Sequence, residues 1–446
     1  MNKEKLPSAY HKVFTASVVS NLGNGVSAVA YPWVASSLTR SPILLSIIGL
    51  MSSLPWLLFS LPAGVFIDRF PRRSVIVFTD IFRGVITAIV AFTLLFEQSH
   101  IHLVRTHIAG VHIQTNTALY LLLLVASFLL SCGVVLGNGA SQTFVPMIVE
   151  GPLLEKANGR MWSAESVADQ FIGPPLASLL LGVSIFAPLL FDAASFFGSA
   201  GLIALIASSV IRPQQISESI PDFRREIKEG LGWLWHNLFL RNLAIILGIF
   251  NFISAIFFSV FILFAQEDLH TTVFTYGVLM TGAAAGGTLG GILGPKMIKR
   301  FGRGPILAIA LVMNPTTSLL MGLSTHWQFA WLISAAEMYA AICWNVVTVT
   351  LRQEIIPDQL LGRVNSAYRF FGLGTQPLGA LLGGALVATC AHFVSRSMAL
   401  RIPMFVAAGL GVLMAIFAMP HLTTAKIEAA RSQSKKSEQE VVNCPY

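Results

Sequence analysis

The side chains that could do chemistry in this sequence are carboxylates that lie inside long apolar runs. Glu337 stands near the middle of the run 328–351, and Glu165 and Asp169 stand near the start of the run 161–184. A charge at the centre of a bilayer costs about 2.5–3.5 kcal/mol, so a carboxylate there needs a proton, a partner or a water-filled cavity. These side chains are therefore candidates for carrying a proton.

Each of these carboxylates also has a structural interpretation. Glu165 and Asp169 share a helix face at a spacing of four residues, where each raises the proton affinity of the other. A helix-capping or solvated role is the alternative for that pair. Asp80, three residues before Arg83, could form a structural ion pair with it. For Glu337, proton coupling or cation recognition competes with a buried hydrogen bond between helices. All four carboxylates are kept as candidates for proton coupling.

The elements that must hold these groups are membrane-spanning helices. Of 446 residues, 54% are hydrophobic and 11% are charged, and mean hydropathy is +0.71. An ordinary soluble domain is roughly 25% charged. A helix needs about 20 mostly apolar residues to cross a bilayer. The apolar runs predict an all-α integral membrane fold with spans at 13–37, 43–66, 74–97, 118–147, 161–184, 187–210, 242–265, 274–298, 305–324, 328–351, 365–390 and 400–419.

The basic residues predict the orientation of these twelve spans. With the N-terminus inside, 23 of the 29 Lys and Arg residues fall in inside segments and four in outside segments. This bias is typical of cytoplasmic loops. We therefore expect a multi-pass protein of the plasma or inner membrane with both termini in the cytoplasm. The charge distribution also argues against nucleic acid as a partner, because the basic residues form short clusters between apolar runs.

The chain divides near its middle into two similar halves. The segment 211–241 has an amphipathic helical pattern and is predicted to lie along the cytoplasmic membrane surface. Arg69-Phe70-Pro71-Arg72 in the first half matches Arg300-Phe301-Gly302-Arg303 in the second, and Pro175-Leu176 matches Pro377-Leu378. We expect a six-helix bundle over 1–210, a second over 242–420, and a disordered cytoplasmic tail over 421–446, which is rich in Ser, Lys, Gln and Glu.

The segment between the second and third spans has its own chemical logic. Gly64 permits close approach of helices, and Asp68 at a helix end could face the positive N-terminus of another helix. Arg69, Arg72 and Arg73 could pair with carboxylates or lipid phosphates. A plain basic anchor at the membrane surface is the simpler interpretation, but such an anchor does not require Gly64 or Asp68.

This segment resembles the signature of the major facilitator superfamily, Gly-x-x-x-Asp-Arg/Lys-x-Gly-Arg-Arg/Lys. Pro71 stands in place of the second glycine, which leaves the turn geometry usual in the family open here. The resemblance implies two six-helix repeats that alternate in access to the two sides of the membrane. It also implies that Gly64, Asp68, Arg69, Arg72 and Arg73 latch the two halves together on the cytoplasmic side.

Further segments are similar to the macrolide-efflux and enterobactin-exporter branch of the superfamily. They are Leu54-Pro55-Trp56, Ala157-Asn158-Gly159-Arg160, Asp192-Ala193-Ala194-Ser195-Phe196 and Gly362-Arg363-Val364-Asn365-Ser366. This resemblance implies export of a drug, macrolide, siderophore or metabolite by proton antiport. The run 118–147 contains no arginine, so it lacks the Arg-x-x-Gln-Gly element of some drug antiporters.

In the superfamily, spans 1, 4, 7 and 10 line a central cavity. The resemblance therefore implies a substrate cavity built from amides and aromatic rings, which suits a bulky amphipathic solute. Packing against lipid or other helices is the alternative for the phenylalanines. The candidates are Asn21, Asn24, Asn138, Gln142, Asn251, Phe257, Trp344 and Asn345.

The sequence lacks the motifs of several enzyme classes. No phosphate-binding loop, zinc-protease motif or esterase motif is present, so we expect a transporter and not an enzyme. The four cysteines and the histidines of 98–117 match no zinc pattern, so we expect no metal and no cofactor other than a proton gradient. The expected partners are a small molecule and the lipid bilayer, and the expected state is a monomer. An importer or facilitator of the same fold, and a non-transporting membrane sensor or assembly factor, are the alternatives.

Overall fold

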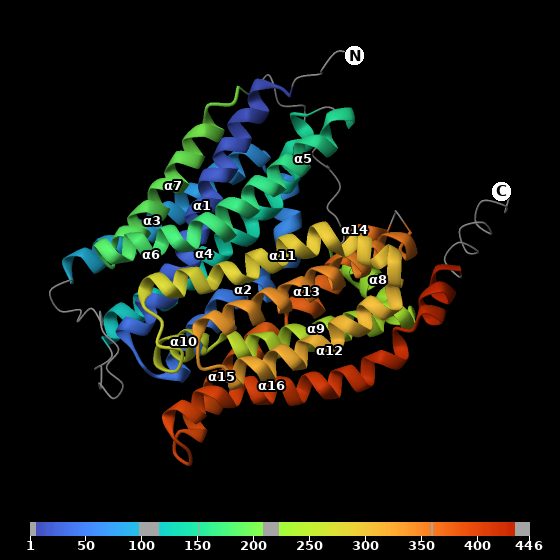
Figure 1. The fold of residues 1–446 in the computed structure, drawn as a ribbon. Coiled ribbons are helices and arrows are strands. Elements are labelled where there is room, and N and C mark those ends of the chain that lie inside the picture. The colour runs from blue at the N-terminus through green and yellow to red at the C-terminus, as the bar shows by residue number, and fades with distance from the viewer. Residues whose placement is uncertain (1–5, 98–115, 150, 208–222, 358–359, 433–446) are drawn as a thin grey trace. The chain divides into compact units, whose positions relative to one another are not determined.

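The computed structural model describes residues 6–97, 116–149, 151–207, 223–357 and 360–432, and its regular structure there is helical (Figure 1). Within the helices, the side chains of 60–68, 151–152, 155, 223–227, 361–362 and 366 lie outside the described residues. Twelve helical segments of the described chain are long and apolar enough to cross a membrane. The predicted all-α fold with twelve spans is therefore confirmed. The histidine-containing segment 98–115 lies outside the described residues.

The chain separates into two compact units, each of which takes in two stretches of sequence. One unit contains Met1–Ile220 and Ile262–Thr281, and the other contains Pro221–Phe261 and Gly282–Tyr446. The segment Ile262–Thr281 comes from the second half of the sequence and packs with the first unit. There, Gln266 donates a hydrogen bond to Ser36 Oγ at 3.0 Å and accepts one from Arg40 at 2.5 Å.

In the first unit, α1 packs against α6 and α7, α3 packs against α4 and α7, and α2 packs against α4. Side-chain caps mark some of the helix ends, as where Asn116 accepts a hydrogen bond from Leu119 N at the start of α4. The helices are α1 (Ser8–Leu38), α2 (Pro42–Arg69), α3 (Arg72–Phe96), α4 (Thr117–Phe144), α5 (Gly151–Ser166), α6 (Gly173–Val183) and α7 (Ala187–Ala204), with short turns at η1 (Val145–Met147) and η2 (Val167–Ile172).

The fifth span contains a π-helical turn just before two consecutive prolines. Val167–Ile172 forms a π-helical turn between α5 and α6. Pro174 and Pro175 have no N–H, so they cannot donate to the carbonyls of Gln170 and Phe171 as an α-helix requires. At the end of this turn, the N–H of Gly173 reaches back five residues to Ala168 O. The wider turn thus accommodates the missing donors.

In the second unit, α9 packs against α15 and α16, and α12 packs against α13 and α16. A core of buried side chains, among them Leu243, Leu307, Leu351 and Ile427, joins these helices. The helices are α8 (Phe223–His236), α9 (Leu238–Phe258), α11 (Val273–Phe301), α12 (Arg303–Leu323), α13 (Trp327–Ile355), α14 (Leu361–Leu373), α15 (Gln376–Cys390) and α16 (Arg396–Ala418), and η5 (Met419–His421) follows the last of them. The short helix α10 (Phe261–Glu267) and the start of α11 pass into the first unit.

The expectation of a disordered tail from residue 421 is wrong for its first part. Residues 424–432 form a helix, which we call the tail helix. Its Ile427 is fully buried in the core of the second unit. The prediction failed because it rested on composition, whereas Ile427 and Ala430 pack against the core and Arg431 pairs with Glu354. Residues 433–446 lie outside the described residues.

Candidate functional site

A cavity of about 510 Å³ lies within the first unit. Its wall combines backbone and side chains from α1, α3, α4, α5 and α7. Amides, hydroxyls, apolar side chains and the charged groups of Asp80, Arg83 and Glu165 line it, so it offers both hydrogen bonds and hydrophobic contact. Six of the side chains selected from the sequence contribute to this wall: Asn21, Asn24, Asp80, Asn138, Gln142 and Glu165.

Glu165 is held in this cavity by the first helix. Ser17 Oγ donates a short hydrogen bond to its carboxylate. Asn21 Nδ2 in turn donates to Ser17 O at 2.9 Å, which keeps the amide beside the same pair. Sequence reasoning did not single out Ser17. The signal was a polar stripe at helical spacing along α1, formed by Ser17, Ser20, Asn21, Asn24 and Ser27.

A constant register between α1 and the fifth span sets the position of Glu165. Ser17 meets Glu165, and eight residues further along each helix Gly25 meets Gly173. A Cβ on Gly173 would lie 2.6 Å from the Cα of Gly25, so the two backbones touch there. In both pairs the two residue numbers differ by the same amount. The close contact of the two glycines therefore fixes how far one helix is shifted along the other. That position brings the hydroxyl to the carboxylate.

Asp169 lies in the π-helical turn, one turn beyond Glu165. Its backbone carbonyl faces Gly25, where an added Cβ would lie 2.0 Å from the oxygen. Its side chain is half-buried and accepts no hydrogen bond from any residue that the structure describes. The two carboxylates therefore differ in setting, since Glu165 lines the cavity and Asp169 does not.

Asp80 and Arg83 do not pair with one another, which corrects the expectation of an ion pair. Asp80 accepts a hydrogen bond from Ser199 Oγ at 2.6 Å. Arg83 donates to Asn24 Oδ1 at 2.5 Å and places its guanidinium 3.9 Å from the ring centroid of Phe196. Partners on α1 and α7 thus compete with the neighbour on the same helix. The spacing along α3 could not reveal them because they come from other helices.

Asp192 is a buried carboxylate near Arg83 in the same unit. Ser27 Oγ donates to it at 2.5 Å, and its exposed fraction is 1%. Gly23 leaves room for this contact, because a Cβ there would lie 2.4 Å from Asp192 Oδ1. The burial of Asp192 against α1 fits a structural role.

Glu337 lies in α13 of the second unit, half-buried, with no hydrogen bond or ion pair to any described residue. Residues two positions away contact α11. Added Cβ atoms on Gly286 and Gly290 would lie 1.8 Å from Ala335 O and 3.0 Å from Tyr339 O. Two residues correspond to about 200° around a helix, so Glu337 faces away from α11.

The other cavity candidates of the second half line neither of the two cavities described for this protein. Phe257 is buried in a cluster of rings with Phe258 and Phe261, at centroid distances of 4.9 and 5.2 Å. Trp344 is buried in the core of the second unit, and Asn345 is exposed. Asn251 accepts a hydrogen bond from Gln376 Nε2 at 3.0 Å.

Two arginines of the signature segment bind the ends of helices in the first unit. Arg72 donates to Thr143 O at 2.8 Å, and Arg73 donates to Ile203 O at 3.3 Å and to Ala204 O. These carbonyls lie in the last turns of α4 and α7, where backbone acceptors lack partners within the helix. Arg69 is exposed. Gly64 and Asp68 belong to the stretch 60–68, whose packing lies outside the described part of the chain.

In the part of the chain that the structure describes, no three His, Cys, Asp or Glu side chains gather closely enough to hold a metal ion.

Two of the similar relatives are named as efflux proteins. Macrolide efflux protein A of Streptococcus pyogenes is 21% identical over 380 residues, which cover 84% of this chain and 88% of that protein. Multidrug efflux pump Tap of Mycolicibacterium fortuitum is 23% identical over 410 residues, which cover 88% of this chain and 92% of that protein.

Solved structures share the fold at low sequence identity. A bacterial homologue of the iron transporter ferroportin in its inward-facing state matches with a TM-score of 0.70 at 13% identity, over 94% of this chain and 99% of that chain. The nucleoside transporter NupG matches with a TM-score of 0.69 at 12% identity, over 93% and 99% of the two chains. These relatives and this fold are those of transporters, which are not enzymes.

The profile of the family described as transmembrane secretion effector matches residues 7–444, nearly the whole chain. The segments that resembled the superfamily in the sequence fall inside this match. This protein is thus a multi-pass membrane transporter that belongs to the transmembrane secretion effector family of the major facilitator superfamily.

Proposed function

We propose that this transporter exports small amphipathic molecules by proton antiport, and that Glu165 takes up the proton in the cavity of the first unit. One observation carries the proposal. Glu165 lines a cavity that also presents the amides of Asn21, Asn138 and Gln142, and a serine hydroxyl is its hydrogen-bond partner. The relatives named for macrolide and multidrug efflux support the direction and the substrate class.

The chemistry of antiport follows from this setting. As a carboxylate, Glu165 accepts a hydrogen bond from Ser17 and attracts a cationic or donor-rich solute. Once protonated it loses that charge and becomes a donor, so bound solute and bound proton oppose one another. Alternating access of the two sides of the membrane then exchanges one for the other. The chain acts as a monomer in the plasma membrane with both termini in the cytoplasm, and the proton gradient supplies the energy.

Glu337 is the second carboxylate for which a role in coupling is proposed. It lies within a membrane-spanning helix without a described partner, a costly arrangement unless it binds a proton or faces water. We place it after Glu165 because it does not line either described cavity.

The test measures solute and proton movement together. Cells lacking their own efflux pumps would express the protein and accumulate radiolabelled erythromycin or ethidium, and proteoliposomes with an imposed pH gradient would report proton flux with a pH-sensitive dye. Export lowers accumulation in cells, and collapse of the gradient with an uncoupler restores it. Glu165→Gln is expected to reduce proton-coupled transport at least about tenfold while the protein still folds.

Glu229→Gln is the matched control, because Glu229 forms a surface ion pair with Arg363 outside the cavity. Unchanged solute and proton fluxes in Glu165→Gln would remove that residue from the mechanism, and the same measurement on Glu337→Gln decides the second carboxylate. Raised accumulation in cells would indicate an importer. Absence of any flux with every probe would favour a sensor or assembly factor.

A further inference from the structure

A second cavity, of about 860 Å³, lies within the second unit at the ends of three spans. The span Leu238–Glu267 begins there, and the spans Trp327–Ile355 and Arg396–His421 end there. The amphipathic helix α8 and the tail helix complete its wall. Because it lies where spans leave the apolar part of the chain, this cavity is at the level expected for lipid headgroups.

The polar part of this cavity is basic. Arg241, Lys426, His236 and His421 line it, and none of the described residues in its lining is Asp or Glu. The amides of Asn237 and Asn242 add further polar groups. Lys426 is exposed and forms no ion pair with any described residue. The arrangement suits a ligand that carries negative charge and several acceptor oxygens, as a phosphate does.

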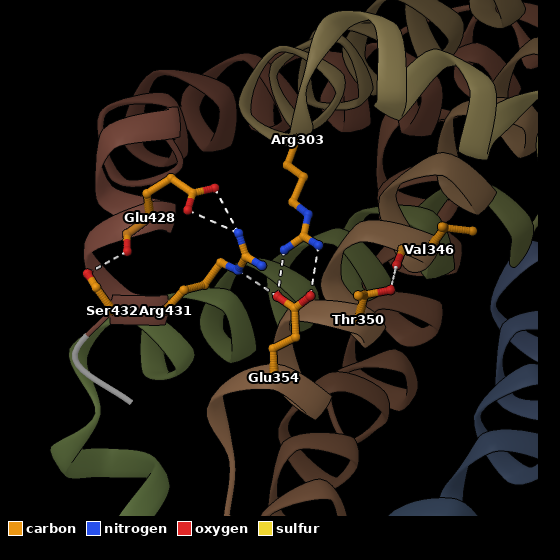
Figure 2. A network of polar contacts seen from close by, with 7 residues as sticks. All are labelled: Arg303, Val346, Thr350, Glu354, Glu428, Arg431 and Ser432. Atoms are coloured by element: carbon orange, nitrogen blue, oxygen red, sulfur yellow. Dashed lines mark hydrogen bonds and ion pairs between the residues drawn. The ribbon is translucent and has the colours of Figure 1, made fainter. Parts of the chain in front are cut away.

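Carboxylates on the surrounding helices are engaged by other arginines. Figure 2 shows Glu354 of α13 between two guanidinium groups, with Arg303 donating at 2.6 and 2.8 Å and Arg431 at 2.7 Å. Arg431 also bonds Glu428 of the tail helix at 3.0 Å. On α8, Glu229 pairs with Arg363 at 2.7 Å. Among the described residues, Arg241 and Lys426 therefore form no ion pair in the cavity wall.

Exposed apolar side chains border this cavity at the ends of the spans. Leu238 and Phe417 line the cavity with exposed fractions of 64% and 46%. Trp235, which contacts the lining residue Arg241, is 50% exposed. The guanidinium of Arg241 lies 5.7 Å from the ring centroid of Trp235. Aromatic and aliphatic side chains next to cations at the end of a span are typical of the membrane interface. A soluble phosphate would not use this apolar surface, whereas acyl chains would.

We propose that this cavity binds the phosphate headgroup of an anionic phospholipid, with Arg241 and Lys426 as its phosphate ligands. The acyl chains lie against Leu238 and Phe417. The tail helix forms one wall, and the pair between Arg431 and Glu354 holds that wall in place. Arg431 and Glu354 are therefore positioning residues for this site. The site is separate from the cavity that contains Glu165 and does not depend on the export proposal.

The experiment measures lipid retention on the purified full-length protein. Protein in detergent would be mixed with phosphatidylglycerol or phosphatidylcholine of the same acyl composition, and native mass spectrometry would count bound lipids as collision energy rises. Phosphatidylglycerol is expected to be retained more strongly. Arg241→Gln and Lys426→Gln are each expected to weaken its retention about fivefold, since one basic residue near a lipid surface contributes about that factor.

Lys299→Gln is the matched control, because Lys299 is a basic residue in the last turn of α11 that does not line the cavity. Equal losses in Lys299→Gln and the two cavity variants would show a general charge effect and overturn the proposal. Equal retention of the two lipids would also overturn it. Glycerol 1-phosphate serves as the soluble competitor, and displacement of the lipid at equal concentration would identify a soluble-phosphate site instead. Arg431→Gln should weaken retention as well, and circular dichroism would verify that each variant is folded.

Discussion

Arg72 and Arg303 occupy equivalent positions in the two halves of the sequence and bind equivalent helix ends. Each is the first residue of its helix, α3 or α12, and each reaches the last turn of the helix that follows. Arg72 donates to the backbone carbonyl of Thr143 at 2.8 Å, whereas Arg303 donates two hydrogen bonds to the Glu354 side chain. The repeat thus preserves the basic residue and the helix end that it stabilises, while the acceptor has changed.

The turns before these two arginines differ in backbone conformation. Gly302 has a φ of 86° and a ψ of 166°, which side chains rarely allow, and Pro71 has a φ of −56°. Gly302→Ala is expected to destabilise the protein by about 1–3 kcal/mol. Pro71→Gly should cost about 0.4–1 kcal/mol, through the greater freedom of the unfolded chain. Thermal unfolding in detergent would compare them, and a larger loss in Pro71→Gly would contradict this account.

Glu354 connects α12, α13 and the tail helix (Figure 2). Glu354→Gln removes the charge that both Arg303 and Arg431 contact, and a hydrogen bond to a charged group contributes about 1.5–3 kcal/mol when well formed. Partial exposure reduces this value. We expect a lower unfolding temperature and faster proteolysis after residue 423. Glu428→Gln should have the smaller effect, because Glu428 contacts only Arg431 among these groups. Unchanged cleavage of the tail in Glu354→Gln would show that Ile427 alone holds it.

The contact between Gly25 and the fifth span allows a precise packing test. Gly25→Ala would place a Cβ 2.0 Å from Asp169 O, so α1 must move away from that span. We expect a loss of about 1–3 kcal/mol in stability and reduced transport, since the contact of Ser17 with Glu165 depends on the same register. Gly182→Ala is the control, because nothing lies within 4 Å of its added Cβ. Similar unfolding temperatures for the two variants would argue against the register.

The predicted orientation places both ends of the chain in the cytoplasm, which reporter fusions can test. A fluorescent protein that matures only in the cytoplasm, fused after Tyr446, should be bright, and alkaline phosphatase at the same place should be inactive. A cysteine placed in the segment 98–115, which the charge distribution predicts to lie outside, should react with a membrane-impermeant maleimide from outside. The opposite labelling pattern would show that the topology is reversed and that the basic cavity of the second unit lies on the outer side of the membrane.

The candidate site shows where sequence reasoning stops. The amides were selected because the resemblance places their spans around a cavity. Asn21, Asn24, Asn138 and Gln142 line one cavity, whereas Asn251 accepts a hydrogen bond from Gln376 and Asn345 is exposed. Phe257 and Trp344 were selected on the same resemblance and are packed into the interior of the protein. An amide must find a partner or water, so its type constrains its place. An aromatic ring is equally stable against lipid, in a core or in a cavity, so its type does not.

The sequence by itself determined the twelve spans, the repeat and the carboxylates that need an explanation, because crossing a bilayer demands long apolar runs in which every charge is conspicuous. Only the tertiary structure decided the partners of those charges. Arg83 forms a hydrogen bond with Asn24 and not with Asp80, and Arg431 of the tail helix forms a hydrogen bond with Glu354. Such pairings depend on the register of helices far apart in the sequence, which is set by close contacts such as that of Gly25 with Gly173. No local pattern encodes that register.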